Sequence, residues 1–177
     1  DRVVAQKGAG AVALVTGASF GIGRAIARAF AGAGANVALV ARRSEPLEGA
    51  ANAIAEETGQ KAIAIAGDVS GADECARVIA ATQAALGNVD VLVNNAGSSA
   101  RGPFESVSDE MWQSDLDLKL FAAIRLARIL LPGMKARRFG RIINILNTGA
   151  KAPPAEGAPT AVSRAAGMAL TKVLSAE

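Results

Sequence analysis

The chain has 177 residues, of which 51% are hydrophobic and 20% are charged, and its formal net charge is +3 at pH 7. This length suits a single domain spanning residues 1–177, and the short, interrupted apolar runs exclude a membrane span. The dispersed positive charges and the aromatic content of 3% argue against nucleic-acid binding, because such sites combine basic runs with stacking side chains.

The amino-terminal residues lack the apolar stretch of a secretory signal peptide, which favours a cytoplasmic protein. Cys75 is the only cysteine, so an internal disulfide is impossible. Its apolar neighbours Val78, Ile79 and Leu86 predict a buried thiol rather than a nucleophile. The chain contains no histidine, and we expect no metal site.

Apolar runs with strand character alternate with segments of helical spacing along the chain. The runs cover residues 12–15, 37–40, 63–66, 89–93 and 142–145. Such alternation predicts an α/β fold in which crossover helices connect the strands of a parallel sheet. Ser44, Ser70 and Ser108 precede helical segments and are predicted N-caps.

A glycine-rich segment, Thr16–Gly23, follows the first apolar run and reads T-G-A-S-F-G-I-G. Directly after it, Ile22, Ile26 and Phe30 recur at the spacing of one helix face. Glycines at the end of a buried strand let main-chain N–H groups approach a pyrophosphate at the positive end of the next helix. The order of strand, glycine turn and helix therefore predicts a dinucleotide-binding turn.

The carboxyl-terminal segment predicts a last helix over residues 161–176, after a proline-containing loop at residues 151–159. The sequence then stops without a following strand. Five strands leave the outer edge of a doubly wound sheet open. We therefore expect the fold to be incomplete at its carboxyl end and the natural protein to continue for two more strands.

Three ordered motifs together resemble the short-chain dehydrogenase/reductase family. They are the turn Thr16–Gly23, the pair Asp68 and Val69 after the third apolar run, and Asn94–Gly97 after the fourth. The resemblance extends over residues 11–177. It implies a Rossmann-like, doubly wound parallel sheet with helices on both faces that binds NAD or NADP.

The resemblance also implies which residues contact the coenzyme. The pyrophosphate and the nearby ribose would be lined by Gly17, Ser19, Gly21, Ile22 and Gly23. Asp68 and Val69 would contact the adenine, and Asn95, Ala96 and Gly97 would flank the coenzyme.

The end of the second apolar run favours NADP over NAD. Arg42 and Arg43 stand there with no acidic residue beside them, and two guanidinium groups can form paired hydrogen bonds with a phosphate. Phe20 stands where many NADP-preferring members of the family have a basic residue. The alternative is that one or both arginines only solvate the start of the next helix.

The proton-transfer residues of the family are replaced, and the chain contains no tyrosine. Family members use a serine, a Tyr-x-x-x-Lys pair and an asparagine; here the resemblance puts Asn147, Thr160, Arg164 and Asp117 at these positions in that order. Thr160 is a far weaker acid than a phenol. Arg164 can still bind ribose hydroxyls, and Asn147 can donate a hydrogen bond to a substrate oxygen.

Substitute proton donors are available in Asp117, Thr148 and Ser163. Each also has a structural interpretation, as a helix residue, a loop hydroxyl and a serine on a helix surface, because such groups commonly bond the backbone. The proton donor is therefore left open by the sequence.

Two classes of function follow. The first is an NADP-dependent oxidoreductase with non-standard active-site residues that acts on a small carbonyl or alcohol. The second is a catalytically silent, coenzyme-binding subunit of an oligomer. The replaced tetrad favours the second, and the intact dinucleotide turn favours the first.

Residues 111–134 form a helical segment that is apolar over a wide arc. A single sheet face cannot cover such a segment, so a second partner is needed. Because the resembled family pairs the corresponding helices between subunits, we expect a homodimer or a homotetramer.

Overall fold

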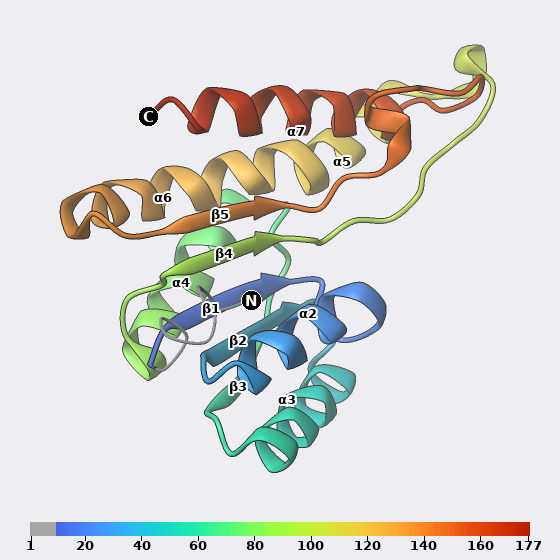
Figure 1. Cartoon of the computed structure of the whole chain (residues 1–177). Coiled ribbons are helices and arrows are strands. Elements are labelled where there is room, and N and C mark those ends of the chain that lie inside the picture. The colour runs from blue at the N-terminus through green and yellow to red at the C-terminus, as the bar shows by residue number, and fades with distance from the viewer. Residues whose placement is uncertain (1–9) are drawn as a thin grey trace.

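The computed structural model describes residues 10–177 as a five-stranded parallel sheet with helices on both faces (Figure 1). The strands are β1 (Val12–Thr16), β2 (Asn36–Ala41), β3 (Ala62–Ala66), β4 (Val91–Asn94) and β5 (Arg141–Asn144). Their order in the sheet is β3-β2-β1-β4-β5, and every neighbouring pair is parallel. The predicted Rossmann-like fold is confirmed. Residues 1–9 of the predicted domain, and the predicted lack of a leader there, lie outside the described residues.

Six α-helices connect and follow the strands of this part of the chain. They are α2 (Gly21–Gly32), α3 (Ser44–Thr58), α4 (Ala72–Leu86), α5 (Asp109–Leu116), α6 (Ala122–Arg137) and α7 (Thr160–Leu174). A π-helical turn, Asp117–Phe121, joins α5 to α6, so the predicted apolar helix 111–134 consists of three pieces. Short 3-10 turns cover Phe104–Ser106 and Thr148–Ala150.

The central strand β1 is apolar on both sides because each face of the sheet carries its own core. Leu14 belongs to the core that includes Leu126 of α6. Its neighbour Val15 belongs to the other core, with Ala27 of α2 and Leu47 of α3. Successive side chains of a strand point to opposite faces, so an uninterrupted apolar run is what a doubly covered strand requires.

Only one of the three predicted N-caps is confirmed. Ser108 caps α5, where its hydroxyl accepts the N–H of Met111 at 3.4 Å. The other two predictions are wrong: Ser44 is already the first residue of α3, and α4 starts at Ala72 after Gly71. The Ser70 hydroxyl instead donates to the Asp68 carboxylate at 2.8 Å, within a local turn that comes before the helix.

Cys75 is fully buried, as predicted, and its thiol donates to the carbonyl oxygen of Val69. Burial raises the pKa of this thiol, which keeps it protonated and unreactive. Within residues 10–177, no group of three or more acidic, cysteine or histidine side chains is placed to hold a metal ion. No helix in that range is long and apolar enough to cross a bilayer.

Candidate active site

A cleft opens where the carboxyl ends of β1 and β4 lie side by side. β2 and β3 lie on one side of β1, and β4 and β5 lie on the other side. The loops that follow β1 and β4 therefore lead in opposite directions and leave a crevice between them. The cleft has a volume of about 530 Å³. It is lined by Gly17, Ser19, Phe20, Val40, Ala41, Arg42, Arg43, Gly67, Asp68, Val69, Ala96, Gly97, Ser98 and Leu118.

The glycine turn at one end of the cleft leaves no room for a side chain at Gly17 or at Gly23. Gly17 and Gly21 have φ values of +65° and +53°, which only glycine adopts freely. A Cβ atom at Gly23 would lie 2.3 Å from the carbonyl oxygen of Gly17, and one at Gly17 would lie 2.9 Å from the Cα atom of Ala96. The first turn of α2 therefore packs directly on the loop after β4.

Asn95 and Thr16 fix the glycine turn to the loop after β4 by hydrogen bonds. The Thr16 hydroxyl accepts the N–H groups of Asn95 and Ala96, both at 3.0 Å. The Asn95 side chain donates to the carbonyl oxygens of Thr16 and Gly17, at 3.0 and 3.1 Å. Asn95 is not among the residues that line the cleft, so the structure places it as a support of the turn.

The amino end of α2 meets the requirements of an anion site. Its N-cap residue, Phe20, makes no side-chain cap, and the first turn contains no acidic residue. The first N–H groups of a helix have no partner within the helix and carry its positive end. Space is open beside Gly21, where a Cβ atom would have no neighbouring atom within 4 Å. Ile22 and Gly23 do not line the cleft, and their N–H groups belong to this first turn.

Arg42 and Arg43 line the cleft at the end of β2. The Arg43 guanidinium lies over the ring of Phe20, 5.3 Å from its centroid. Phe20 thus contacts one of the two guanidinium groups across the cleft, which is an attractive arrangement between a cation and a ring face. The acidic side chain that lines the cleft, Asp68, accepts the N–H and the hydroxyl of Ser70, at 3.0 and 2.8 Å.

A buried cluster of four polar side chains, the Lys119 cluster, lies between α5, the π-helical turn and α7. Its members, Asp115, Lys119, Thr160 and Ser163, are at most 6% exposed. The Lys119 ammonium forms an ion pair with Asp115 and donates to the Thr160 hydroxyl at 2.9 Å. The Ser163 hydroxyl donates to the second carboxylate oxygen of Asp115 at 2.6 Å.

Burial sets the electrostatics of this cluster. It lowers the pKa of Lys119, an effect that Asp115 opposes and the charge of Arg164 increases. Burial also lowers the pKa of Arg164, against the attraction of Asp115. Arg164 donates to the carbonyl oxygen of Ile145 at 2.8 Å. A Cβ atom at Gly97 would lie 2.5 Å from the Arg164 guanidinium, so Arg164 is placed behind the cleft wall rather than among its lining residues.

Two of the predicted catalytic residues, Asn147 and Thr160, line one further cavity of about 330 Å³. This cavity also includes Ser99, which follows Ser98 of the cleft described above, so the two spaces are adjacent along the loop after β4. Thr148 lines the same cavity. Ser163, predicted on a helix surface, is buried in the Lys119 cluster, because its side of α7 packs on α5.

The structure does not bring Asp117 to Thr160. The Asp117 carboxylate accepts Arg125 at 3.1 Å and Gln113 at 2.9 Å. Lys119 lies beside Thr160 instead. Residues four apart share one helix face, so Asp115 and Lys119 both point to α7, and Asp117, between them in sequence, points elsewhere.

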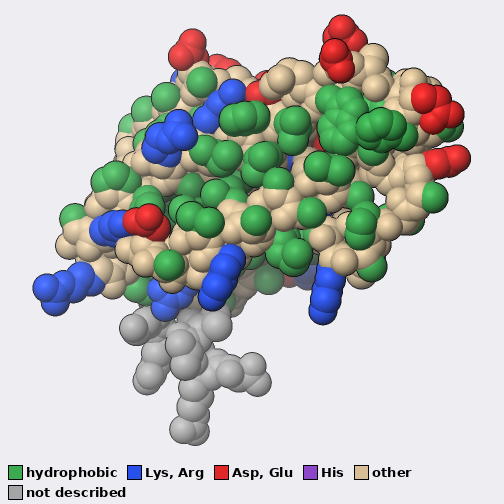
Figure 2. All heavy atoms as spheres, turned by 90° about the horizontal axis from the view of Figure 1, so that it is seen from above, with side chains coloured by type: hydrophobic (Ala, Val, Ile, Leu, Met, Phe, Trp, Pro, Cys, Tyr) green, Lys and Arg blue, Asp and Glu red, His purple; other side chains and the backbone are tan. Residues whose placement is uncertain are grey.

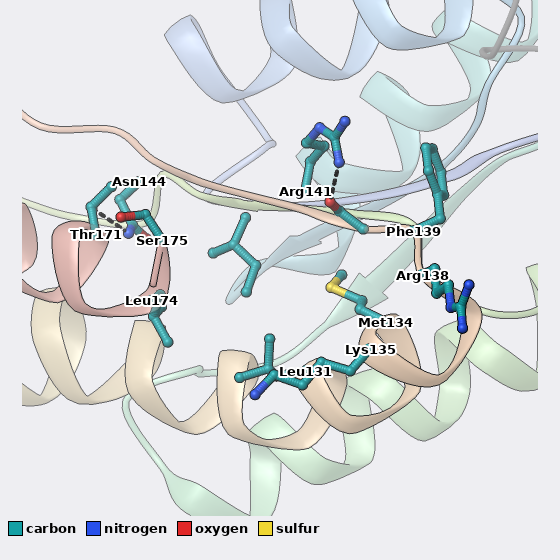
Figure 3. Close-up of a pocket in the computed structure, with 12 residues that line it drawn as sticks. Leu131, Met134, Lys135, Arg138, Phe139, Arg141, Asn144, Thr171, Leu174 and Ser175 are labelled. Atoms are coloured by element: carbon teal, nitrogen blue, oxygen red, sulfur yellow. Dashed lines mark hydrogen bonds between the residues drawn. The ribbon is translucent and has the colours of Figure 1, made fainter. Parts of the chain in front are cut away.

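Another cavity, of about 370 Å³, lies between α6, β5 and α7 (Figure 3). It begins at the amino end of β5, near Met134 and Arg141, where Figure 3 shows Arg141 donating to the preceding carbonyl oxygen. Ligands of open parallel sheets bind at the carboxyl ends of the strands. None of the predicted site residues lines this cavity, and we assign it no role in the reaction.

Comparison with known families decides the class of this site. The model of the family described as short chain dehydrogenase matches residues 11–177. The chain belongs to the short-chain dehydrogenase family. The chain is 38% identical over 170 residues to a short chain dehydrogenase of Pseudocercospora fijiensis. It is 40% identical over 172 residues to a fatty acyl-CoA reductase of Acinetobacter baylyi.

These matches cover 95% of this chain but only 55% and 57% of the two relatives, so the chain spans about half of their length. Among solved structures, L-sorbose reductase from Gluconobacter frateurii, complexed with NADPH and L-sorbose, matches with a TM-score of 0.91 and 39% identity. The match covers 94% of this chain and 63% of the L-sorbose reductase chain. A metagenomic short-chain oxidoreductase in complex with NADP matches with a TM-score of 0.89 and 38% identity, covering 94% and 75%.

Sequence reasoning missed the buried ion pair of Asp115 and Lys119 beside Thr160. A signal was present: an acid and a lysine four residues apart in a helical segment that is otherwise largely apolar. It also missed Leu118, Gly67 and Ser98, which line the cleft without any distinctive chemistry.

Proposed function

We propose that this chain is the coenzyme-binding part of an NADP-dependent oxidoreductase that transfers a hydride between NADP and a small carbonyl or alcohol. One observation carries the proposal: the cleft joins an uncapped helix end at Gly21 to Arg42 and Arg43, with no acid at the end of β2. The complexes of the L-sorbose reductase with NADPH and of the metagenomic oxidoreductase with NADP support it. The reductases among the relatives favour an enzyme over a silent subunit.

Each part of the cleft then has a task. The N–H groups of the first turn of α2 bind the diphosphate, and Arg42 and Arg43 bind the 2′-phosphate. NADPH supplies the hydride when it is bound. Asn147, in the adjacent cavity, donates a hydrogen bond to the substrate oxygen. Arg164 lies against Gly97 and supports the wall of the cleft on the side of the ribose.

Replacing Arg42 by aspartate tests the choice of coenzyme. We expect Arg42→Asp to weaken NADPH binding about 10- to 100-fold, because it removes a charge-assisted hydrogen bond and places a like charge beside the phosphate. NADH lacks the 2′-phosphate, so its affinity is expected to stay the same or to rise. Calorimetric titration of both coenzymes measures the two affinities.

Arg128→Asp is the matched control, since Arg128 is exposed on α6 and lies outside the cleft. It makes the same change of net charge and is expected to leave both affinities unchanged. Equal affinities for NADPH and NADH, before and after Arg42→Asp, would refute the assignment of NADP.

Turnover separates the enzyme from the silent subunit. We expect the full-length protein to oxidise NADPH in the presence of at least one member of a panel of small aldehydes, ketones and ketoses that includes L-sorbose. Absorbance at the NADPH band follows the reaction. Saturable NADPH binding with no oxidation by any member of the panel would decide for the silent subunit.

We also propose a homodimer or a homotetramer. Figure 2 views the molecule from the α7 side, where hydrophobic side chains stand among few charged ones. Large exposed side chains on α5 to α7 support this: Met111, Phe121, Ile129, Val162, Met168 and Val173. Light scattering of the full-length protein measures the oligomeric state. A cytoplasmic location and the lack of nucleic-acid binding stay predictions from the sequence.

A further inference from the structure

Thr160 belongs both to the Lys119 cluster and to the cavity that Asn147 lines. It is therefore the one hydroxyl in the described part of the chain that connects the buried ammonium with the space where we place the substrate. The proposed reaction needs a proton for the carbonyl oxygen, and the family tyrosine that would give it is absent. The connection through Thr160 supplies a path for that proton.

The hydrogen bonds at Thr160 have a direction. Its oxygen accepts the N–H of Ala100 at 3.0 Å and the ammonium of Lys119 at 2.9 Å. A hydroxyl has two acceptor sites and one donor proton, so both acceptor sites are filled and only its own proton is free to be donated. That proton is donated to the carbonyl oxygen of Ala100 at 2.9 Å or to the Asp115 carboxylate at 3.1 Å. To reach a substrate oxygen in the cavity, the hydroxyl must rotate about its C–O bond and leave these acceptors.

The charges around Lys119 make its ammonium a stronger acid than that of an exposed lysine. Burial lowers the pKa of Lys119, and Arg164 on α7 lowers it further. Asp115 on α5 raises the pKa of Lys119 by pairing with the ammonium, but the net shift of this pKa is downward. The Asp115 carboxylate keeps the Ser163 hydroxyl as a partner, at 2.6 Å, when Lys119 becomes neutral.

We infer that Lys119 supplies, through the hydroxyl of Thr160, the proton that the substrate oxygen takes up during carbonyl reduction. The inference rests on the proposed function. The Thr160 hydroxyl gives its proton to the carbonyl oxygen, and Lys119 gives one ammonium proton to Thr160. The carbonyl carbon receives the hydride supplied by NADPH, so that an alcohol and NADP⁺ are formed. Lys119 is left as a neutral amine, which regains a proton from solvent after the alcohol leaves.

Substitutions distinguish the role of Lys119 as a proton donor from its role as the positive partner of Asp115. In the full-length protein, Lys119→Arg keeps the positive partner of Asp115 but cannot release a proton. We expect it to bind NADPH as tightly as the unsubstituted protein and to oxidise NADPH about 100-fold more slowly with the carbonyl panel. Thr160→Val should lose rate to the same extent, whereas Thr160→Ser keeps a hydroxyl and should keep most of the rate. A full rate in Lys119→Arg or in Thr160→Val overturns the inference.

A titration independent of turnover gives the second readout. The protein is labelled with ¹³C at the lysine Cε positions, and the Lys119 signal is identified by its absence from the spectrum of Lys119→Arg. We expect its midpoint below the ordinary lysine value of 10.5 and the reduction rate to fall as the pH rises through that midpoint. A midpoint at or above the ordinary value overturns the role of Lys119 alone. NADPH binding without any turnover of the panel overturns the proposed reaction and the relay with it.

Discussion

Gly23→Ala is expected to weaken NADPH binding by about 100-fold or more, a loss of about 2.7 kcal/mol. The added methyl group would lie 2.3 Å from the carbonyl oxygen of Gly17 and 2.5 Å from the side-chain amide nitrogen of Asn95. Both groups are fixed, since Asn95 donates to the carbonyl oxygens of Thr16 and Gly17. The amino end of α2 must therefore move away from the turn, and its N–H groups no longer point at the diphosphate.

Gly32→Ala is the matched control because it lies at the other end of the same helix, with no atom within 4 Å of its Cβ position. It should leave NADPH affinity unchanged and raise the free energy of unfolding by up to about 1 kcal/mol, since alanine favours a helix over glycine. Calorimetric titration measures affinity, and circular dichroism verifies that both variants are folded. Unchanged NADPH affinity in a folded Gly23→Ala protein would show that the diphosphate binds elsewhere.

The parts of the fold that the sequence predicts well are those set by local patterns. The second apolar run, residues 37–40, predicts a strand, and β2 covers Asn36–Ala41. The glycine turn is equally local, since the φ values of Gly17 and Gly21 and the close approach at Gly23 all arise within eight residues. A buried strand requires apolar residues, and a turn with positive φ values requires glycine, so both can be recognised from a short stretch of sequence.

The Lys119 cluster depends on contacts between distant segments, which no local pattern contains. Lys119 and Thr160 are 41 residues apart and meet only because α7 packs against the π-helical turn. Positional resemblance to the family points to Asp117, whose carboxylate accepts Arg125 in the structure, because residues two apart along a helix lie on different faces. The resemblance likewise assigns Asn95 to the coenzyme, and in the structure its side chain donates to the carbonyl oxygens of Thr16 and Gly17. Both assignments stay predictions.

Asp115→Asn is expected to lower the free energy of unfolding by about 3 to 5 kcal/mol near neutral pH. The substitution keeps the size of the side chain and removes the charge that pairs with Lys119, whose side chain is 0% exposed. An ammonium group that is buried without an opposite charge has lost its hydration free energy, and no ion pair offsets this loss. Ser163 would also lose its charged acceptor. Chemical denaturation followed by circular dichroism measures the loss.

The loss of stability in Asp115→Asn should become smaller as the pH rises, and this pH dependence identifies the unpaired Lys119 ammonium as its cause. Without the carboxylate, burial and Arg164 hold the pKa of Lys119 in the folded state still further below the ordinary value of 10.5. Between the folded and unfolded pKa values the unfolded chain binds more protons, so the free energy of unfolding rises with pH. The variant is therefore expected to be least stable, relative to the unsubstituted protein, near neutral pH and to recover as the pH rises towards the ordinary lysine value.

Glu57→Gln provides the comparison, since Glu57 forms an ion pair of 2.6 Å with Arg28 in which both side chains are at least half exposed. Exposed pairs are hydrated before and after they form, so this variant should unfold almost as the unsubstituted protein does, with no recovery at high pH. Equal small losses for Asp115→Asn and Glu57→Gln would mean that water reaches Lys119. In that case the Lys119 cluster would lack the dry surroundings that make its ammonium a stronger acid than that of an exposed lysine, and the proton path through Thr160 would lose its physical basis.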